Sequence, residues 1–246
     1  MDQILFENAC EMVLNSQPAS DGIGTLQEKS VHSVIKNYLA PDSSKQEIQI
    51  EGFVADIFTG SEIIEVQTGN FQQMRRKLKT FLPLYPVTIV YPIHQTKWIR
   101  WINPQSGEVS PPRKSPKRGS AYSILPELYK IKNFLLDPNL KLHIIITDME
   151  DYRYLDGWGK NKKNRATKCD IVPTKLIDEV TIADKSEYKK LIPDSLVKGF
   201  TSKDYKKASR LPLKESQTAL NILHHVGAVE RVSKEGNAYI YDISKQ

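Results

Sequence analysis

The sequence has 246 residues, of which 39% are hydrophobic and 9% aromatic, and these values suit a globular protein with one large core or two smaller ones. No stretch approaches the roughly 18 consecutive apolar residues of a membrane span, and residues 1–15 lack the basic and apolar regions of a signal peptide. Two cysteines give neither a disulfide framework nor a paired metal motif. We therefore expect a cytoplasmic protein without membrane association.

The net charge of +6 is distributed unevenly along the chain. Residues 1–102 carry 9 Lys and Arg against 11 Asp and Glu, whereas residues 103–172 carry 13 against 8 and residues 173–246 carry 13 against 10. A basic surround beside an acidic centre is typical of a metal-dependent enzyme that acts on a polyanion. Solubilising lysines explain the net charge alone equally well.

The first 40 residues predict two helices. Apolar residues at helical spacing predict the first over residues 1–14, and Thr25 is the N-cap expected for the second, which runs to about Leu39. Glu28 completes a capping box with Thr25 and, together with His32, extends the apolar stripe of this helix. Glu28 is therefore interpreted either as a cap alone or as a ligand in a polar site. His32 is interpreted as a half-buried packing residue or as a phosphate contact.

Residues 47–67 predict strands in which polar side chains interrupt apolar runs. Asp56 interrupts the run that starts at Phe53, and a tight turn at residues 59–61 leads into the next strand. Glu65 and Gln67 leave the same face of that strand, roughly 7 Å apart. Two carboxylates and an amide inside apolar strands are costly unless something pairs with them. A divalent cation such as Mg²⁺ prefers such oxygen ligands.

This arrangement, over residues 24–92, resembles the restriction-endonuclease-like nucleases, the PD-(D/E)xK superfamily. The resemblance implies that Asp56 and Glu65 bind Mg²⁺ or Mn²⁺ and that Glu28 completes the metal site directly or through water. It also implies that Gln67 takes the place of the Lys in Glu-x-Lys, so that the catalytic set is Glu28, Asp56, Glu65 and Gln67. The chain departs from the pattern in two ways. Ala55 rather than proline precedes Asp56, and the amide of Gln67 cannot accept a proton at neutral pH.

Residues 71–82 predict a helix with a basic face, on which we single out Arg75, Arg76 and Lys79. This face is interpreted equally as a solvated surface or as a guide for a phosphate backbone. Further elements are expected as buried strands at 87–91, 97–102 and 140–147, an amphipathic helix at 122–136, and a return to the sheet at 171–182. Residues 1–183 therefore predict an α/β domain with a restriction-endonuclease-like mixed sheet flanked by helices.

Two basic loops stand out in this predicted domain. Residues 103–119 contain four prolines and predict a flexible loop that carries Arg113 and Lys114. Residues 156–165 place an aromatic side chain between glycines and follow it with basic residues. The candidate nucleic-acid contacts in this loop are Trp158, Lys160, Lys162, Lys163 and Arg165. Such a loop can stack bases and grip phosphates, and an ordinary hairpin would look similar.

From about residue 184 the pattern changes to helix, helix, turn, helix and hairpin, an order that resembles a small winged-helix domain over residues 184–246. Residues 214–226 resemble its recognition helix, and residues 228–232 and 238–243 resemble the strands of its wing. The resemblance implies that contacts to the major groove or its phosphates come from Lys214, Ser216, Gln217, Asn221, Arg231 and Lys234. Many winged helices bind protein or dimerise, so the resemblance is more specific for fold than for activity.

The leading hypothesis is a Mg²⁺-dependent endonuclease that hydrolyses DNA phosphodiester bonds and uses the winged helix to bind DNA. A second hypothesis is a catalytically inactive nuclease-like protein that binds DNA as a regulator, and Gln67 keeps it open. A third, a protein-interaction module, would show weak and salt-insensitive DNA affinity. We expect double-stranded DNA as the partner and leave a homodimer open.

Overall fold

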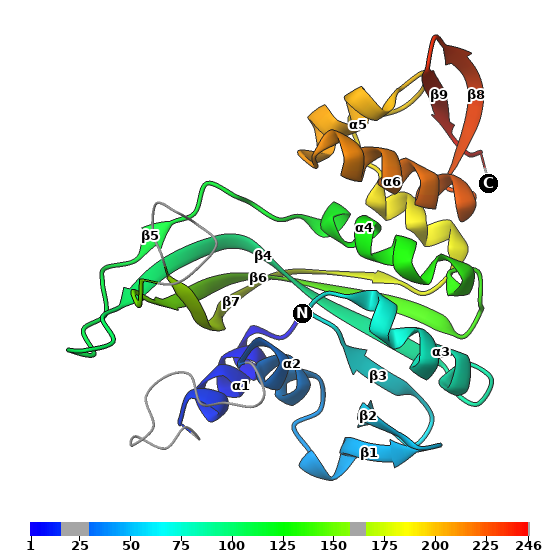
Figure 1. Cartoon of the computed structure of the whole chain (residues 1–246). Helices are drawn as coiled ribbons and strands as arrows, with labels where there is room; N and C mark the ends of the chain where they lie inside the picture. The colour runs from blue at the N-terminus through cyan, green and yellow to red at the C-terminus, as the bar shows by residue number, and fades with distance from the viewer. Residues whose placement is uncertain (16–29, 158–165, 246) are drawn as a thin grey trace. The chain divides into compact units, whose positions relative to one another are not determined.

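The computed structural model describes residues 1–15, 30–157 and 166–245. They form a mixed α/β fold with a seven-stranded mixed sheet flanked by helices (Figure 1). The chain divides into two compact units. Unit 1 contains residues 1–46, 92–119 and 145–178, and unit 2 contains residues 47–91, 120–144 and 179–246. The boundary predicted at residues 183 and 184 lies inside unit 2.

The sheet has the strand order β1-β2-β3-β4-β6-β7, and β5 pairs with β4. Its strands are β1 (Gln46–Ile50), β2 (Phe53–Phe58), β3 (Ile63–Val66), β4 (Val87–Ile102), β5 (Arg113–Lys114), β6 (Leu140–Tyr154) and β7 (Thr167–Ile182). β2 and β3 are antiparallel, with Ile57 opposite Ile64, whereas β3 and β4 are parallel, with Glu65 opposite Ile89.

Hydrogen bonds at both ends show that β4 and β6 run in the same direction. The Val87 N–H donates to the Asn139 carbonyl at 2.8 Å where the two strands start, and the Leu155 N–H donates to the Ile102 carbonyl at 2.9 Å where they end. The two strands expected at 87–91 and 97–102 are a single strand, because β4 continues through residues 92–96. In that stretch the Thr96 N–H donates to the Asp148 side chain at 2.9 Å, which holds the backbone extended.

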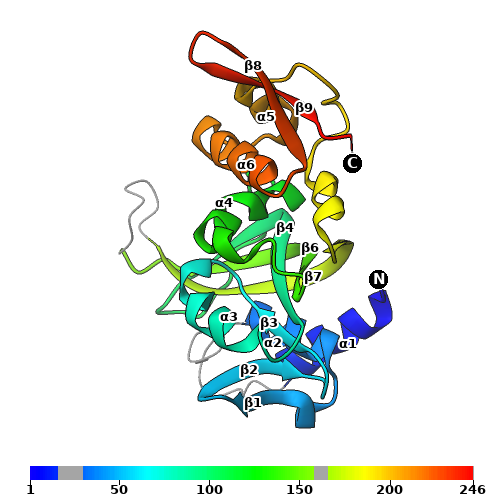
Figure 2. The same ribbon diagram turned by 90° about the vertical axis from the view of Figure 1, so that its right-hand side faces the viewer.

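In unit 1, helices α1 (Gln3–Asn15) and α2 (Ser30–Leu39) lie side by side in both views (Figures 1 and 2). Phe6 and Tyr38 meet edge to face, with ring centroids 5.4 Å apart, so the apolar faces of the two helices are buried against each other. The predicted loop at 103–119 is more ordered than expected. Its β5 segment returns along β4, with Lys114 opposite Trp98.

In unit 2, short helical segments replace the single helix expected at residues 122–136. They are η3 (Ala121–Ile124), α4 (Leu125–Leu128) and η4 (Tyr129–Phe134). The backbone of Ile131 leaves helical geometry, with φ −118° and ψ 22°, and this kink interrupts the helix. Before β4, η2 (Phe71–Met74) and α3 (Arg75–Phe81) bury Leu78 and Phe81 completely.

The end of unit 2 contains η5 (Lys185–Leu191), α5 (Ser202–Ser209), α6 (Leu213–His225) and the two-stranded sheet of β8 (Val229–Glu235) and β9 (Ala238–Ile243). Thr201 caps α5 in a capping box with Asp204. Tyr205 is fully buried and donates its hydroxyl to the Leu191 carbonyl at 2.7 Å. Across the described residues, no helix is long and apolar enough to cross a membrane.

Candidate active site

The β2–β3 hairpin brings Asp56 and Glu65 together. The antiparallel register pairs Ile57 with Ile64, and continuing it by one residue puts Asp56 opposite Glu65. Side chains at directly opposite positions leave the same face of a sheet, with Cβ atoms about 5 Å apart. The Val66 N–H donates to Oδ2 of Asp56 at 2.8 Å and so fixes one oxygen of this carboxylate. A short turn is therefore enough to create a pair of acidic groups.

Glu65 is almost completely buried, with 2% of its surface exposed. Burial raises the pKa of Glu65 to about 7, and the negative charge of Asp56 contributes to the increase. The charge and hydrogen bond of Lys77 act in the opposite direction, and so does a hydrogen bond from the main chain of Asp56. Oε1 of Glu65 is buried and has no hydrogen-bond partner among the described residues. This carboxylate is consequently short of partners near neutral pH.

Lys77 is the site residue that the sequence analysis missed. It lies on α3 and its Nζ donates to Oε2 of Glu65 at 2.7 Å. Helical spacing alone did not distinguish it. Lys77 is three residues after Met74 and four before Phe81, both of which are buried, but Arg75 is likewise four residues after Phe71 and three before Leu78, and Arg75 is exposed. Only the contact with Glu65 on β3 identifies Lys77 as a site residue.

Unlike Glu65, which has an oxygen without a partner among the described residues, Gln67 is held by hydrogen bonds of both its main chain and its side chain. Its main-chain N–H donates to the Val90 carbonyl at 2.8 Å, and its side-chain Nε2 donates to the Gly69 carbonyl. The amide is therefore anchored to the turn that precedes η2. The side chain of Gln67 thus has a structural role in this turn, which its match to the Lys of the Glu-x-Lys motif did not imply.

The remaining members of the predicted metal site are placed as follows. Glu28 lies outside the described residues. His32 is half-buried on α2 in unit 1, whereas Asp56 and Glu65 belong to unit 2. Within the described part of the chain, no group of three or more His, Cys, Asp or Glu side chains could hold a metal ion. The acidic centre that the structure shows is therefore a pair, and Mg²⁺ commonly binds through one or two carboxylates and several waters.

The basic residues predicted on α3 and on the loop at 103–119 are exposed. They are Arg75, Arg76 and Lys79 on α3, and Arg113 and Lys114 on β5. Nζ of Lys114 lies 5.6 Å from the ring centroid of Trp98. The predicted contacts at residues 158–165, namely Trp158, Lys160, Lys162, Lys163 and Arg165, lie outside the described residues.

In the C-terminal part, four predicted contacts are exposed: Lys214, Gln217, Arg231 and Lys234. Asn221 is half-buried, and its Oδ1 accepts a hydrogen bond from Nζ of Lys132 at 2.9 Å. Ser216 is fully buried and donates its hydroxyl to the Pro212 carbonyl at 3.0 Å. This burial corrects the prediction for Ser216, because a residue on the inner face of α6 cannot reach DNA.

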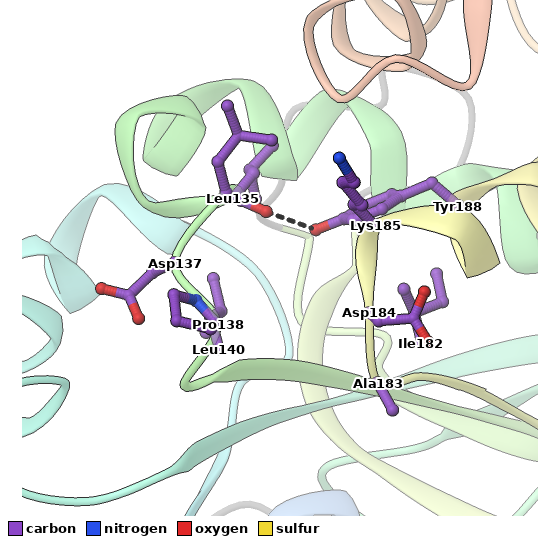
Figure 3. Close-up of a pocket in the computed structure, with 10 residues that line it drawn as sticks. Leu135, Asp137, Pro138, Leu140, Ile182, Ala183, Asp184, Lys185 and Tyr188 are labelled. Carbon is purple, nitrogen blue, oxygen red and sulfur yellow. Dashed lines mark hydrogen bonds between the residues drawn. The ribbon is translucent and has the colours of Figure 1, made fainter. Parts of the chain in front are cut away.

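A separate pocket lies between the loop that follows η4 and the start of η5 (Figure 3). Asp137 and Asp184 lie on opposite sides of it, and their carboxylates point away from each other (Figure 3). Both accept main-chain hydrogen bonds, Asp137 from Asn139 at 2.9 Å and Asp184 from Ser186 at 2.8 Å. The acidic groups of this pocket therefore stabilise turns, in contrast to Asp56 and Glu65 on β2 and β3.

Comparison with known proteins identifies the family of the chain. A family model described as a domain of unknown function, DUF8091, matches residues 29–183. An uncharacterized protein of Treponema pallidum (strain Nichols) is 34% identical over 157 residues, which cover 63% of this chain and 61% of that protein. The chain thus spans less than two thirds of the length of this relative. No solved structure matches the chain significantly. Because the family model covers more than half of the chain, including Asp56, Glu65 and Lys77, the chain belongs to the DUF8091 family.

Proposed function

We propose that this protein is a divalent-metal-dependent nuclease that hydrolyses DNA phosphodiester bonds, with Asp56 and Glu65 as the metal ligands. The observation that carries the proposal is the cross-strand pair of the half-buried Asp56 and the buried Glu65, in which Oε1 of Glu65 has no hydrogen-bond partner among the described residues. Like charges at opposite positions of two strands repel each other. A cation between them would remove the repulsion and occupy the orphaned oxygen.

The order of elements supports the same proposal. Helix α2, strands β1 to β3, helix α3 and strand β4 follow one another in the order expected of the nuclease-like core, with one carboxylate on β2 and the next on β3. The order α5, α6, β8 and β9 is that of a winged helix, which would contribute DNA binding. Glu28 keeps its proposed role as a third ligand, directly or through water.

The donor set fits a hard cation. Two carboxylates are the protein contribution that Mg²⁺ often has, and the remaining positions are then filled by water and substrate oxygens. A bound Mg²⁺ or Mn²⁺ would lower the pKa of a water molecule and stabilise the charge that develops on the scissile phosphate. The Val66 N–H would hold Asp56 in the orientation that this site needs.

Lys77 supplies the cationic group that Gln67 cannot. Its Nζ lies 2.7 Å from Oε2 of Glu65, so its charge is next to a proposed metal ligand. A lysine there orients Glu65 and offsets negative charge on the substrate. The amide of Gln67 has no basic nitrogen, so the proton of the attacking water passes to bulk water or to a substrate phosphate.

The exposed basic residues support DNA as the substrate. Arg75, Arg76 and Lys79 share α3 with Lys77, and Arg113 and Lys114 extend along β5. Lysine and arginine side chains of this kind contact phosphates irrespective of sequence. We propose double-stranded DNA and a cytoplasmic location, and the homodimer stays open.

The proposal is tested by Asp56→Asn, measured as Mg²⁺-dependent cleavage of duplex DNA. We expect cleavage to fall by at least about 100-fold, because a loss of this size is usual when an electrostatic group of an active site is removed. The matched control is Asp194→Asn, which makes the same change at an exposed position. Circular dichroism and the urea midpoint should be unchanged in both variants. Retained cleavage by a folded Asp56→Asn protein would remove Asp56 from the mechanism.

A second candidate function is DNA binding without cleavage. It is favoured by the ion pair between Lys77 and Glu65, which can take the place of a metal, and by the amide of Gln67, which is committed to the Gly69 carbonyl. Calorimetric titration with Mn²⁺ separates the two candidates. Uptake of one ion that Asp56→Asn abolishes supports the nuclease, and no specific uptake supports the silent DNA-binding protein.

A further inference from the structure

Helix α6 is not free along its length to enter a major groove. Lys132 of η4 donates to Oδ1 of Asn221, and Nε2 of His225 lies 3.2 Å from the Lys132 carbonyl oxygen. Ile222, on the same side of the helix, is fully buried. One flank of α6 is thus covered by other parts of unit 2, and its exposed polar stripe is narrow. A recognition mode that needs only a small part of the helix fits this surface better.

A pocket between α6 and the β8–β9 hairpin exposes a small part of the helix. It is lined by Gln217, Asn221, Arg231, Asn237, Tyr239 and Tyr241 among others. Tyr241 is buried and stacks on Phe200 with ring centroids 6.2 Å apart and an interplanar angle of 26°. This stack, together with the Phe200–Tyr241 main-chain hydrogen bonds, gives the pocket a preformed floor.

The lining combines a stacking surface with groups that can bind the edge of a base. The guanidinium carbon of Arg231 lies 4.2 Å from the ring centroid of Tyr239, and 43% of the Tyr239 surface is exposed. Tyrosine and arginine planes stack on nucleobases regardless of base identity. The carboxamides of Gln217 and Asn237 are exposed and carry both donors and acceptors, as the hydrogen-bonding edge of a base requires.

The charge of this region suits a nucleotide rather than an uncharged ring. Residues 198–246 carry nine Lys and Arg against five Asp and Glu. Nζ of Lys234 lies 5.6 Å from the Tyr239 ring, so a base on Tyr239 would have its phosphate within reach of a cation. A base that is paired inside a duplex cannot present its face to Tyr239, whereas an unpaired base can.

We propose that this pocket binds an unpaired nucleobase, and that the protein therefore recognises DNA at a junction between single and double strands. This inference rests on the proposed function, because it names the class of DNA that the nuclease would act on. In this proposal the hairpin provides the stacking surface and α6 reads the edge of the base.

The test measures binding without cleavage. The Asp56→Asn protein, in EDTA, is titrated with a blunt DNA hairpin and with the same hairpin carrying a short single-stranded overhang that contains 2-aminopurine. We expect the overhang to raise affinity about tenfold, which is the gain that one stacked base provides, and the 2-aminopurine fluorescence to change on binding.

Tyr239→Leu should remove this preference and leave the affinity for the blunt hairpin unchanged. Tyr129→Leu is the matched control, because it makes the same change at another exposed tyrosine outside the pocket. Gln217→Ala, at an exposed position of α6, provides a second variant if Tyr239→Leu does not fold. Equal affinity for the two hairpins, or a preference that survives both pocket variants, would overturn the inference. Because no step depends on metal or cleavage, the result is independent of whether the protein proves to be a nuclease.

Discussion

Two buried carboxylates, Asp151 in unit 1 and Glu65 in unit 2, have pKa values that are shifted in opposite directions. Asp151 is fully buried and accepts hydrogen bonds from Nε and Nη2 of Arg153 at 3.1 and 2.7 Å, and Nζ of Lys97 lies 3.3 Å away. Burial alone would raise the pKa of Asp151, but the hydrogen bond and charge of Arg153, together with Lys97, outweigh burial and the pKa is lowered. Glu65 has one cation, a second carboxylate opposite it and a pKa raised to about 7.

This difference in pKa and in partners distinguishes Asp151, whose charge is structural, from Glu65, whose charge is a candidate for function. A buried ion pair is stable only when its charges and hydrogen bonds are satisfied. Asp151 has two cationic partners and is satisfied within unit 1. Glu65 has Lys77 as its cationic partner and one oxygen without a hydrogen-bond partner among the described residues, so a further cation or a proton would improve it. Perturbed carboxylates of the second kind are typical of functional sites.

The largest expected effect compares the two carboxylates directly. Asp151→Asn should lower the free energy of unfolding by about 3 kcal/mol, because it leaves Lys97 and Arg153 beside a neutral group. Glu65→Gln should not lower it at pH 7.5, since the amide removes both a buried charge and the repulsion from Asp56. Urea denaturation of both variants gives the comparison. A greater loss in Glu65→Gln would make Glu65 a structural ion-pair residue like Asp151.

The second largest effect is the pH dependence of the free energy of unfolding, which should differ in sign between Glu65 and Asp151. The folded state holds the proton of Glu65 up to a pH of about 7, whereas the unfolded state releases it near 4.5. Between these values the folded state binds more protons, so the free energy of unfolding falls as the pH rises, by on the order of 3 kcal/mol. The stabilisation from Asp151 has the opposite sign, because its pKa is lowered from 3.8 and its contribution is lost only as the pH falls below that value.

Urea denaturation at several pH values between 5 and 8 measures this decline, and Glu65→Gln is the control that should lack it. Mg²⁺ should restore stability at pH 8 more than at pH 5, because protons compete for the same oxygens. Identical pH profiles for the natural protein and Glu65→Gln would contradict the raised pKa.

The smallest effect concerns Lys77. Lys77→Met removes the charge and hydrogen bond that hold the pKa of Glu65 down, so this pKa should rise from about 7 by about one pH unit. Carbon-13 NMR of labelled glutamate side chains would follow the titration. Lys79→Met is the matched control on the same helix, because Lys79 is exposed. A pKa that changes equally in both variants would show that Lys77 acts only through the general field of α3.

Where local chemistry decides the structure, the sequence was sufficient. The turn at residues 59–61 is short, so Asp56 and Glu65 must lie near each other once β2 and β3 form a hairpin. The capping box of Thr201 and Asp204 at the start of α5 is also local, because it involves only neighbouring residues.

Long-range packing decided the rest. The ion pair of Lys77 with Glu65 joins α3 to β3, and the burial of Ser216 depends on how α6 packs. The continuation of β4 depends on Asp148, a residue 52 positions from Thr96. The sequence alone therefore determined which groups carry charge and which neighbours share a face. Only the tertiary structure decided which of those charges would be paired, because pairing depends on contacts between segments that are distant along the chain.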